Sequence, residues 1–229
     1  GSGFISECAR SFWTPLKTAS NSNLYWADID EQNCSPYPAA SETPDGNMVE
    51  KGGQSYELRS LTPANRNVLT CDASCDSSLA AFNVSNTAIT SAALGVTDAE
   101  RDELINWARG LNSDAESIAD SLNADGSVND KATAAAEVLM RPSAHGDVVH
   151  SRPVAINYAA TDSATAQVVV FYGGNDGMLR AVNGNRESAA GGISFSGKGP
   201  GEEFWSFVAP ESYGLFERLK ANTPLIKFA

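Results

Sequence analysis

The chain has 229 residues, and its 28 acidic and 16 basic side chains give it a net charge of −12 at pH 7. This length can bury a sizeable core as one large domain or two modest ones. The acidic balance argues against a nucleic-acid partner, which needs a basic face, and against electrostatic binding to anionic lipid. No apolar run in the sequence approaches the roughly 20 residues of a membrane-spanning helix.

All the cysteines lie in the first third of the chain, at Cys8, Cys34, Cys71 and Cys75. An even number fits two disulfides, and we favour the pairs Cys71–Cys75 and Cys8–Cys34, which imply an oxidising compartment. The C-x3-C spacing and the presence of only two histidines argue against structural zinc. The alternative is four reduced, buried thiols, because cysteine is a common core residue.

Three regions differ in character. Residues 1–95 are rich in Ser, Asn, Pro and Thr and are predicted to be a loop-rich lead-in that carries the cysteines. Residues 96–145 are predicted to form a helix followed by an acidic linker. Residues 146–229 have the pattern of short β-strands separated by Gly- and Ser-rich turns.

The run "VTDAERDELINWARGL" predicts a helix. Thr97 and Glu100 match the capping box that begins many helices, and Arg109-Gly110 supplies a typical C-terminal cation and stop. Apolar residues recur between these ends at helical spacing. A second, short helix is expected over 131–140, within a stretch that otherwise reads as a polar insertion or linker.

Four strands are predicted from "RPVAINY", "QVVVFYGG", "GMLRAVNG" and "EEFWSFVAP". Four short antiparallel strands in sequence describe one blade of a β-propeller, and blades are stable when stacked in a ring of about four to eight. The predicted fold class is therefore mainly β with some helix: the start of a propeller, with one blade and the beginning of the next. Because this chain cannot close a ring by itself, we expect it to be a fragment of a longer protein.

Several runs together resemble the PilY-type (PilC in some species) proteins associated with the tip of type IV pili. The specific part is "HGDVVHSRPVAINY" followed by "VVVFYGGNDGMLRAVNG" and "EEFWSFVAPE", and further similarity lies in "DGNMVEKGG", "RNVLTCDASC", "LAAFNVSN" and "LINWARG". These runs cover most of residues 45–211 in the family's order. Alone, the Gly-Gly-Asn-Asp-Gly run would mark only a quinoprotein-like propeller repeat.

The resemblance implies a large secreted protein with a C-terminal β-propeller, exported through the periplasm to the bacterial cell surface. The implied function is non-catalytic: pilus assembly, opposition to pilus retraction, and adhesion. The implied partners are minor pilins or other pilus-tip proteins, and a host or abiotic surface. This chain corresponds to the lead-in and first blade of that propeller.

The acidic stretch after the helix offers Asn112, Asp114 and Glu116 at alternate positions, with Asp125 further on. Calcium loops begin with oxygen ligands at positions 1, 3 and 5. The EF-hand pattern then fails, because its Gly and Glu positions hold other residues. The resemblance to proteins with acidic calcium loops keeps calcium as a hypothesis for these four residues, beside a solvated acidic linker.

Two further groups of polar residues are candidate sites. His145, Asp147 and His150 in "HGDVVH" cannot all share one strand face, so satisfied polar residues leading into a strand are expected rather than a metal site. Asn175 and Asp176 are expected to form a tight turn beside Gly177, accepting backbone hydrogen bonds, rather than to bind a ligand.

No motif for nucleophilic catalysis or dinucleotide binding is present in the sequence. The main alternative function is a fragment of a periplasmic quinoprotein dehydrogenase, whose cofactor would bind along the axis of a closed ring. A third is a propeller scaffold that docks other envelope proteins. The "GDVVHSRP" run and the cysteine-bearing lead-in favour the pilus-tip hypothesis over both.

The calcium hypothesis predicts heat of binding when calcium is titrated into the protein by calorimetry. Replacing Asp114 with Asn removes a carboxylate ligand and is expected to weaken binding at least about tenfold, because calcium affinity depends on the number of charged oxygen ligands. No heat at millimolar calcium would remove the site from this segment.

Overall fold

The computed structural model describes residues 54, 57–58, 61–71, 75, 78–113, 140–141, 144–159, 166–185 and 196–223. Its strands are β1 (Val68–Cys71), β2 (Leu79–Ala81), β3 (Val154–Asn157), β4 (Val168–Gly173), β5 (Met178–Asn183) and β6 (Glu203–Val208). Its helices are η1 (Pro63–Asn65), α2 (Ser91–Leu94), α3 (Asp98–Ala108), η3 (Pro210–Ser212) and α5 (Leu215–Ala221).

The six strands form one mixed sheet in the order β2-β1-β6-β5-β4-β3. The predicted four-stranded antiparallel meander is confirmed as β3 to β6. Two further strands from the lead-in, which the sequence analysis did not predict, extend this meander. β1 pairs in parallel with β6, and β2 pairs antiparallel with β1. The fold is therefore mainly β, as expected, and the lead-in is part of the sheet.

The turn between β4 and β5 has the predicted chemistry. The N–H of Gly177 donates to the carbonyl of Gly174 (3.1 Å), and the N–H of Gly174 donates to the carbonyl of Met178 (2.9 Å). Gly177 has a φ of +78°, in the left-handed region where glycine is favoured. Asp176 accepts a hydrogen bond from the N–H of Met178 at 3.2 Å, which confirms its role in closing the turn.

Helix α3 begins at the predicted capping residues. The Glu100 carboxylate accepts hydrogen bonds from the backbone N–H of Thr97 (2.9 Å) and from its hydroxyl (2.7 Å). These bonds lower the pKa of Glu100. The helix ends at Ala108, and Gly110 follows with a φ of +107°. The second predicted helix, over 131–140, lies outside the described residues except for Met140, which forms a β-bridge with Leu111.

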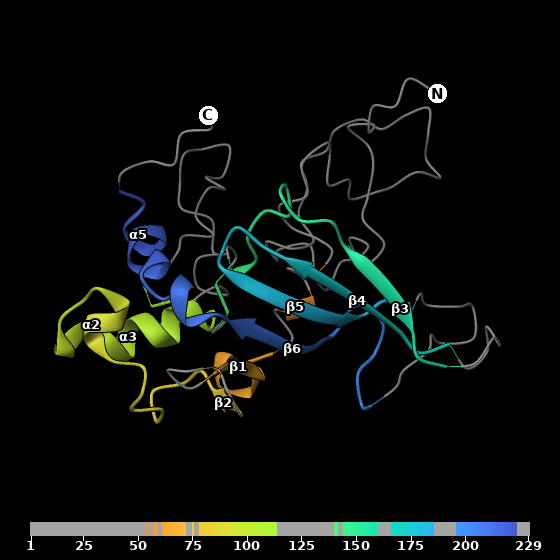
Figure 1. Cartoon of the computed structure of the whole chain (residues 1–229), viewed down its shortest axis with the longest axis horizontal. Helices are drawn as coiled ribbons and strands as arrows, with labels where there is room; N and C mark the ends of the chain where they lie inside the picture. The colour runs from red at the N-terminus through yellow and green to blue at the C-terminus, as the bar shows by residue number, and fades with distance from the viewer. Residues whose placement is uncertain are drawn as a thin grey trace, which may run out of the picture.

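The helices lie beside the part of the sheet built by β1 and β6, whereas β3 forms the far edge (Figure 1). The hydrophobic core joins side chains of α2, α3 and α5 to one side chain from each of β1, β5 and β6. It includes Leu94, Leu104, Ile105, Trp107, Phe216, Val68, Met178 and Val208, all nearly inaccessible to solvent. We call the side of the sheet that carries Val68, Met178 and Val208 the core face.

The opposite side, which we call the open face, also carries apolar side chains. The register places one row of side chains across four strands, in the order Val154, Phe171, Ala181 and Trp205. The Phe171 and Trp205 rings lie 5.9 Å apart over the buried Ala181. Apolar residues of neighbouring rows on this face include Leu69, Ile156, Val169, Leu179 and Phe207. The open face is therefore largely apolar.

A disulfide joins Cys71 to Cys75, as predicted. It closes the chain just after β1 and fixes the start of the connection to β2. Cys8 and Cys34 lie outside the described residues, so their pairing stays a prediction. Within the described part of the chain, no helix has the length and apolar character needed to cross a membrane.

Candidate functional site

Four buried charged side chains from separate parts of the chain meet on the core face. Arg66 precedes β1, Asp176 lies in the β4–β5 turn, Arg180 is on β5 and Glu203 begins β6. The two guanidinium groups and two carboxylates balance in charge. We refer to these four residues as the ion-pair network. Buried charges are tolerated only when they are paired and hydrogen-bonded, so the geometry of each contact matters.

Arg66 is the N-terminal member of the network. Its Nε donates to Glu203 Oε1 and its Nη2 to Glu203 Oε2, both at 3.0 Å, which makes the ion pair bidentate. Nη2 also contacts the hydroxyl of Ser206 at 3.0 Å, and Nη1 donates to the carbonyl of Arg109 at 2.8 Å. The Ser206 hydroxyl in turn donates to Glu203. One side chain thus ties the start of β1 to β6 and to the end of α3.

Arg180 is the central member of the network. Its Nη1 donates to Asp176 Oδ1 at 3.0 Å, its Nη2 pairs with Asp176 Oδ2, and Nη2 also contacts the carbonyl of Ala144 at 3.2 Å. Its Nε lies 3.6 Å from Glu203 Oε2 without forming a hydrogen bond to it. Glu203 therefore lies between two guanidinium groups and shares its charge with both.

The pKa values of the network follow from this pairing. Burial by itself raises the pKa of Asp176, but the Arg180 charge and hydrogen bond, together with the N–H of Gly146, outweigh it and bring the pKa to about 2. Burial likewise opposes ionisation of Glu203, yet Arg66 and Arg180 hold its pKa below the usual value. Burial lowers the pKa of the Arg180 guanidinium, but the negative charge of Asp176 and its hydrogen bond outweigh burial and raise that pKa. Asp176, Arg180 and Glu203 are thus charged at neutral pH.

The network also holds the loop that leads into β3. The N–H of Gly146 donates to Asp176 Oδ2 at 3.0 Å, so the β4–β5 turn binds this loop directly. His145 Nε2 lies 2.9 Å from the hydroxyl of Tyr172 on β4, and the two rings are in contact. Burial, and then the nearby charge of Arg180, lower the pKa of His145 to about 4. His145 is therefore neutral at pH 7.

Two more arginines hold the end of α3: Arg109 binds the segments beside β1 and β2, and Arg141 packs on the helix itself. Arg109 donates to four backbone carbonyls, those of Pro63, Ala64, Arg66 and Phe82, at 2.7 to 3.2 Å. Burial and the charge of Arg66 lower its pKa. The Arg141 guanidinium lies 3.6 Å over the centre of the Trp107 ring and donates to the Trp107 carbonyl at 2.5 Å. All of these hydrogen bonds go to backbone carbonyls, so they do not depend on the side chains of the accepting residues.

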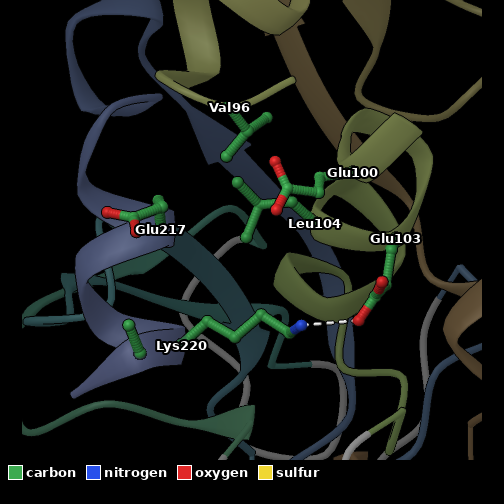
Figure 2. Close-up of a pocket in the computed structure, with 7 residues that line it drawn as sticks. Val96, Glu100, Glu103, Leu104, Glu217 and Lys220 are labelled. Atoms are coloured by element: carbon green, nitrogen blue, oxygen red, sulfur yellow. Dashed lines mark hydrogen bonds and ion pairs between the residues drawn. The ribbon is translucent and has the colours of Figure 1, made fainter. Parts of the chain in front are cut away.

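A shallow pocket of about 260 Å³ lies between α3 and α5 (Figure 2). Its lining combines the apolar residues Val96, Leu104 and Ala221 with Glu100, Glu103, Glu217 and Lys220. Two of the carboxylates have partners, because Glu100 caps α3 and Glu103 accepts from Lys220 Nζ at 2.5 Å. The lining contains no histidine, cysteine or serine, and its one lysine is paired with Glu103.

The other candidate site residues lie only partly within the described chain. Asn112 lies just after α3, whereas Asp114, Glu116 and Asp125 lie outside the described residues, so the calcium hypothesis stays a prediction. His145 is a satisfied polar residue, as expected. Asp147 and His150 are exposed in the loop that leads to β3. Across the described ranges, no group of three or more His, Cys, Asp or Glu side chains could hold a metal ion.

No family model, curated protein or solved structure matches this chain. The function is therefore inferred from the residues and their contacts. In the network, the ionisable groups pair with one another and with backbone groups. The arrangement joins the β4–β5 turn, strands β5 and β6, and the two segments that lead into β1 and β3. Its chemistry is that of a structural clamp.

Glu203 is the residue whose loss should damage this clamp most. Replacing it with Gln leaves Arg66 without its counter-charge and weakens the neutralisation of Arg180, and breaking a buried pair from one side typically costs about 3–5 kcal/mol. We expect a loss of this size in the free energy of unfolding measured by urea denaturation. Glu217→Gln, on the exposed side of α5, is the control and should change stability by less than about 0.5 kcal/mol. Equal losses in the two variants would contradict the clamp.

His145 predicts a distinct acid dependence. Its pKa is about 4 in the folded protein and 6.5 ordinarily, so the unfolded chain binds the proton first. The stability associated with His145 is therefore fully present above pH 6.5 and falls as the pH drops to 4, by about 3 kcal/mol in total. His145→Gln should remove this part of the pH dependence in denaturation series. Tyr172→Phe keeps the ring buried and should retain it; a pH profile of His145→Gln that matches the original protein would contradict the assignment.

Proposed function

We propose that this chain is part of a non-catalytic pilus-tip adhesin and type IV pilus assembly factor of the PilY type. The proposal rests on the sequence resemblance and on the sheet that those runs build. The segments "HGDVVHSRPVAINY", "VVVFYGGNDGMLRAVNG" and "EEFWSFVAPE" supply β3, β4, β5 and β6, together with the loop that the ion-pair network holds. The residues that carry the resemblance are thus those that build one continuous meander.

The observation that carries the proposal is the apolar open face. Leu179 and Ile156 have 42% and 41% of their surface exposed, and Phe171, Trp205 and Phe207 are only half-buried. A contiguous apolar area of this kind marks a surface that packs against another protein layer. In a propeller each blade packs its face on the next, so we interpret β3 to β6 as one blade and the open face as its stacking surface.

The ion-pair network supports a non-catalytic role. Its charged groups hold one another and the backbone, which makes the meander a rigid unit for packing and for transmitting force. A quinoprotein dehydrogenase requires a cofactor site on the axis of a closed ring. None of the described contacts points to such a cofactor site.

The proposal is tested in the bacterium that encodes this chain. Deleting the gene should reduce the number of surface pili and adherence to surfaces, measured by electron microscopy of sheared pili and by an adhesion assay. Normal piliation and adherence in the deletion strain would overturn the proposed function. Complementation with the unaltered gene should restore both properties.

Complementation with an open-face variant tests the stacking surface. Leu179→Asp places a charge in the middle of the open face, so the full-length protein should lose stability and fail to restore piliation, because a buried unpaired carboxylate is costly. Val149→Asp is the matched control: Val149 is an exposed apolar residue in the loop before β3. Full complementation by Leu179→Asp, with surface levels equal to the control, would contradict stacking through this face.

A further inference from the structure

Strand β3 is an open edge of the sheet. Among the described strands it pairs only with β4, and all four of its residues, Val154 to Asn157, are exposed. An edge strand presents unpaired backbone groups, which are a template for a further strand. β3 is therefore open to pairing with a further strand.

The register shows which amides face outward. The N–H of Tyr158 donates to the carbonyl of Gln167, at 3.0 Å, on the side of β4. Because inward and outward amides alternate along an antiparallel strand, Val154, Ile156 and Tyr158 direct their backbone groups to β4. Ala155 and Asn157 then direct theirs away from the sheet. In the described part of the chain, no hydrogen bond satisfies the outward backbone groups of these two residues.

The side chains of the same strand are apolar and exposed. Val154, Ile156 and Tyr158 share the open face and have 52%, 41% and 62% of their surface accessible. Residues 153–160, "PVAINYAA", include no charged side chain, and neither do residues 167–174 of the neighbouring strand. In a chain of net charge −12, this edge is a place where two copies can approach without facing carboxylates.

The other edge of the sheet is protected. β2 is only three residues long, and one of its outward carbonyls, that of Ala81, accepts a hydrogen bond from Asn86 Nδ2 at 2.9 Å. Short edge strands and local capping are usual ways to prevent edge-to-edge pairing. β3 has only Pro153 at its start, with a regular register and no bulge. The β2 edge is therefore protected against pairing with another strand, whereas the β3 edge is not.

We propose that β3 pairs antiparallel with β3 of a second copy of this chain, so that the two sheets become one continuous sheet. A two-fold axis through Ile156 makes each Ala155 exchange its outward hydrogen bonds with the partner's Asn157. The same register places Ile156 beside the partner's Ile156 and Val154 beside the partner's Tyr158, all on the open face. Every facing pair on that face is apolar, so one strand supplies both halves of the contact.

Self-association is tested by sedimentation equilibrium of the purified protein from about 10 µM to about 1 mM. A short edge contact is small, so we expect dimers at the upper concentrations. Hydrogen exchange at the two ends of this range adds a local readout: the amides of Ala155 and Asn157 should become protected as the concentration rises. A monomer throughout the range would overturn the proposal.

Two variants locate the contact. Ile156→Lys places two like charges beside each other at the axis and should weaken dimerisation at least about tenfold. Ala155→Pro removes an outward N–H that β4 does not use, and should weaken it similarly without adding charge. Circular dichroism and the melting temperature should show that both variants remain folded.

Leu79→Lys is the matched control, because Leu79 is an exposed aliphatic residue on β2, at the opposite edge of the sheet. It should leave dimerisation unchanged. Dimers that are lost in Leu79→Lys and retained in Ile156→Lys would place the contact at the β2 edge and would overturn the β3 contact.

Discussion

The structure depends on one buried carboxylate shared by two guanidinium groups. Glu203 holds Arg66 in a bidentate pair and lies 3.6 Å from Arg180, and Arg180 binds Asp176 in the turn. These contacts connect residues that are 137 positions apart in the sequence. Buried ion pairs contribute little net stability compared with apolar packing, but a member left alone is costly. The network therefore fixes which strands are neighbours more than it adds to the free energy of folding.

The pairing of Arg66 with Glu203 explains why β1, a segment of the lead-in, joins the sheet. β1 pairs in parallel with β6 over only two residue pairs, Val68 with Ser206 and Leu69 with Phe207. So short a ladder is a weak determinant of pairing. Arg66, immediately before β1, anchors it by binding both Glu203 and the Arg109 carbonyl at the end of α3. The Arg66 guanidinium thus links the end of α3 to the sheet through polar contacts, inside an otherwise apolar core.

The two faces of the sheet have different consequences. On the core face, helices cover the apolar residues, and the network satisfies the charges among them. On the open face, a row of aromatic and aliphatic side chains remains partly accessible and ends at the exposed strand β3. A face and an edge are separate surfaces: the face takes another layer of side chains, whereas the edge takes backbone hydrogen bonds. One sheet can therefore engage two neighbours without competition between them.

The sequence by itself determined the local elements. Alternation of apolar residues located β3 to β6, the Asn-Asp-Gly run located the turn, and Thr97 with Glu100 located the start of α3, because each signal depends on neighbours a few residues away. Only the tertiary structure decided that Asp176 is also an ion-pair partner, that Arg66 and Glu203 meet, and that β1 and β2 join the sheet. A short strand such as Val68–Cys71 has no distinctive period, and a charged residue carries no sign of its partner. Those outcomes depend on contacts between distant parts of the chain, which exist only once the meander has brought them together.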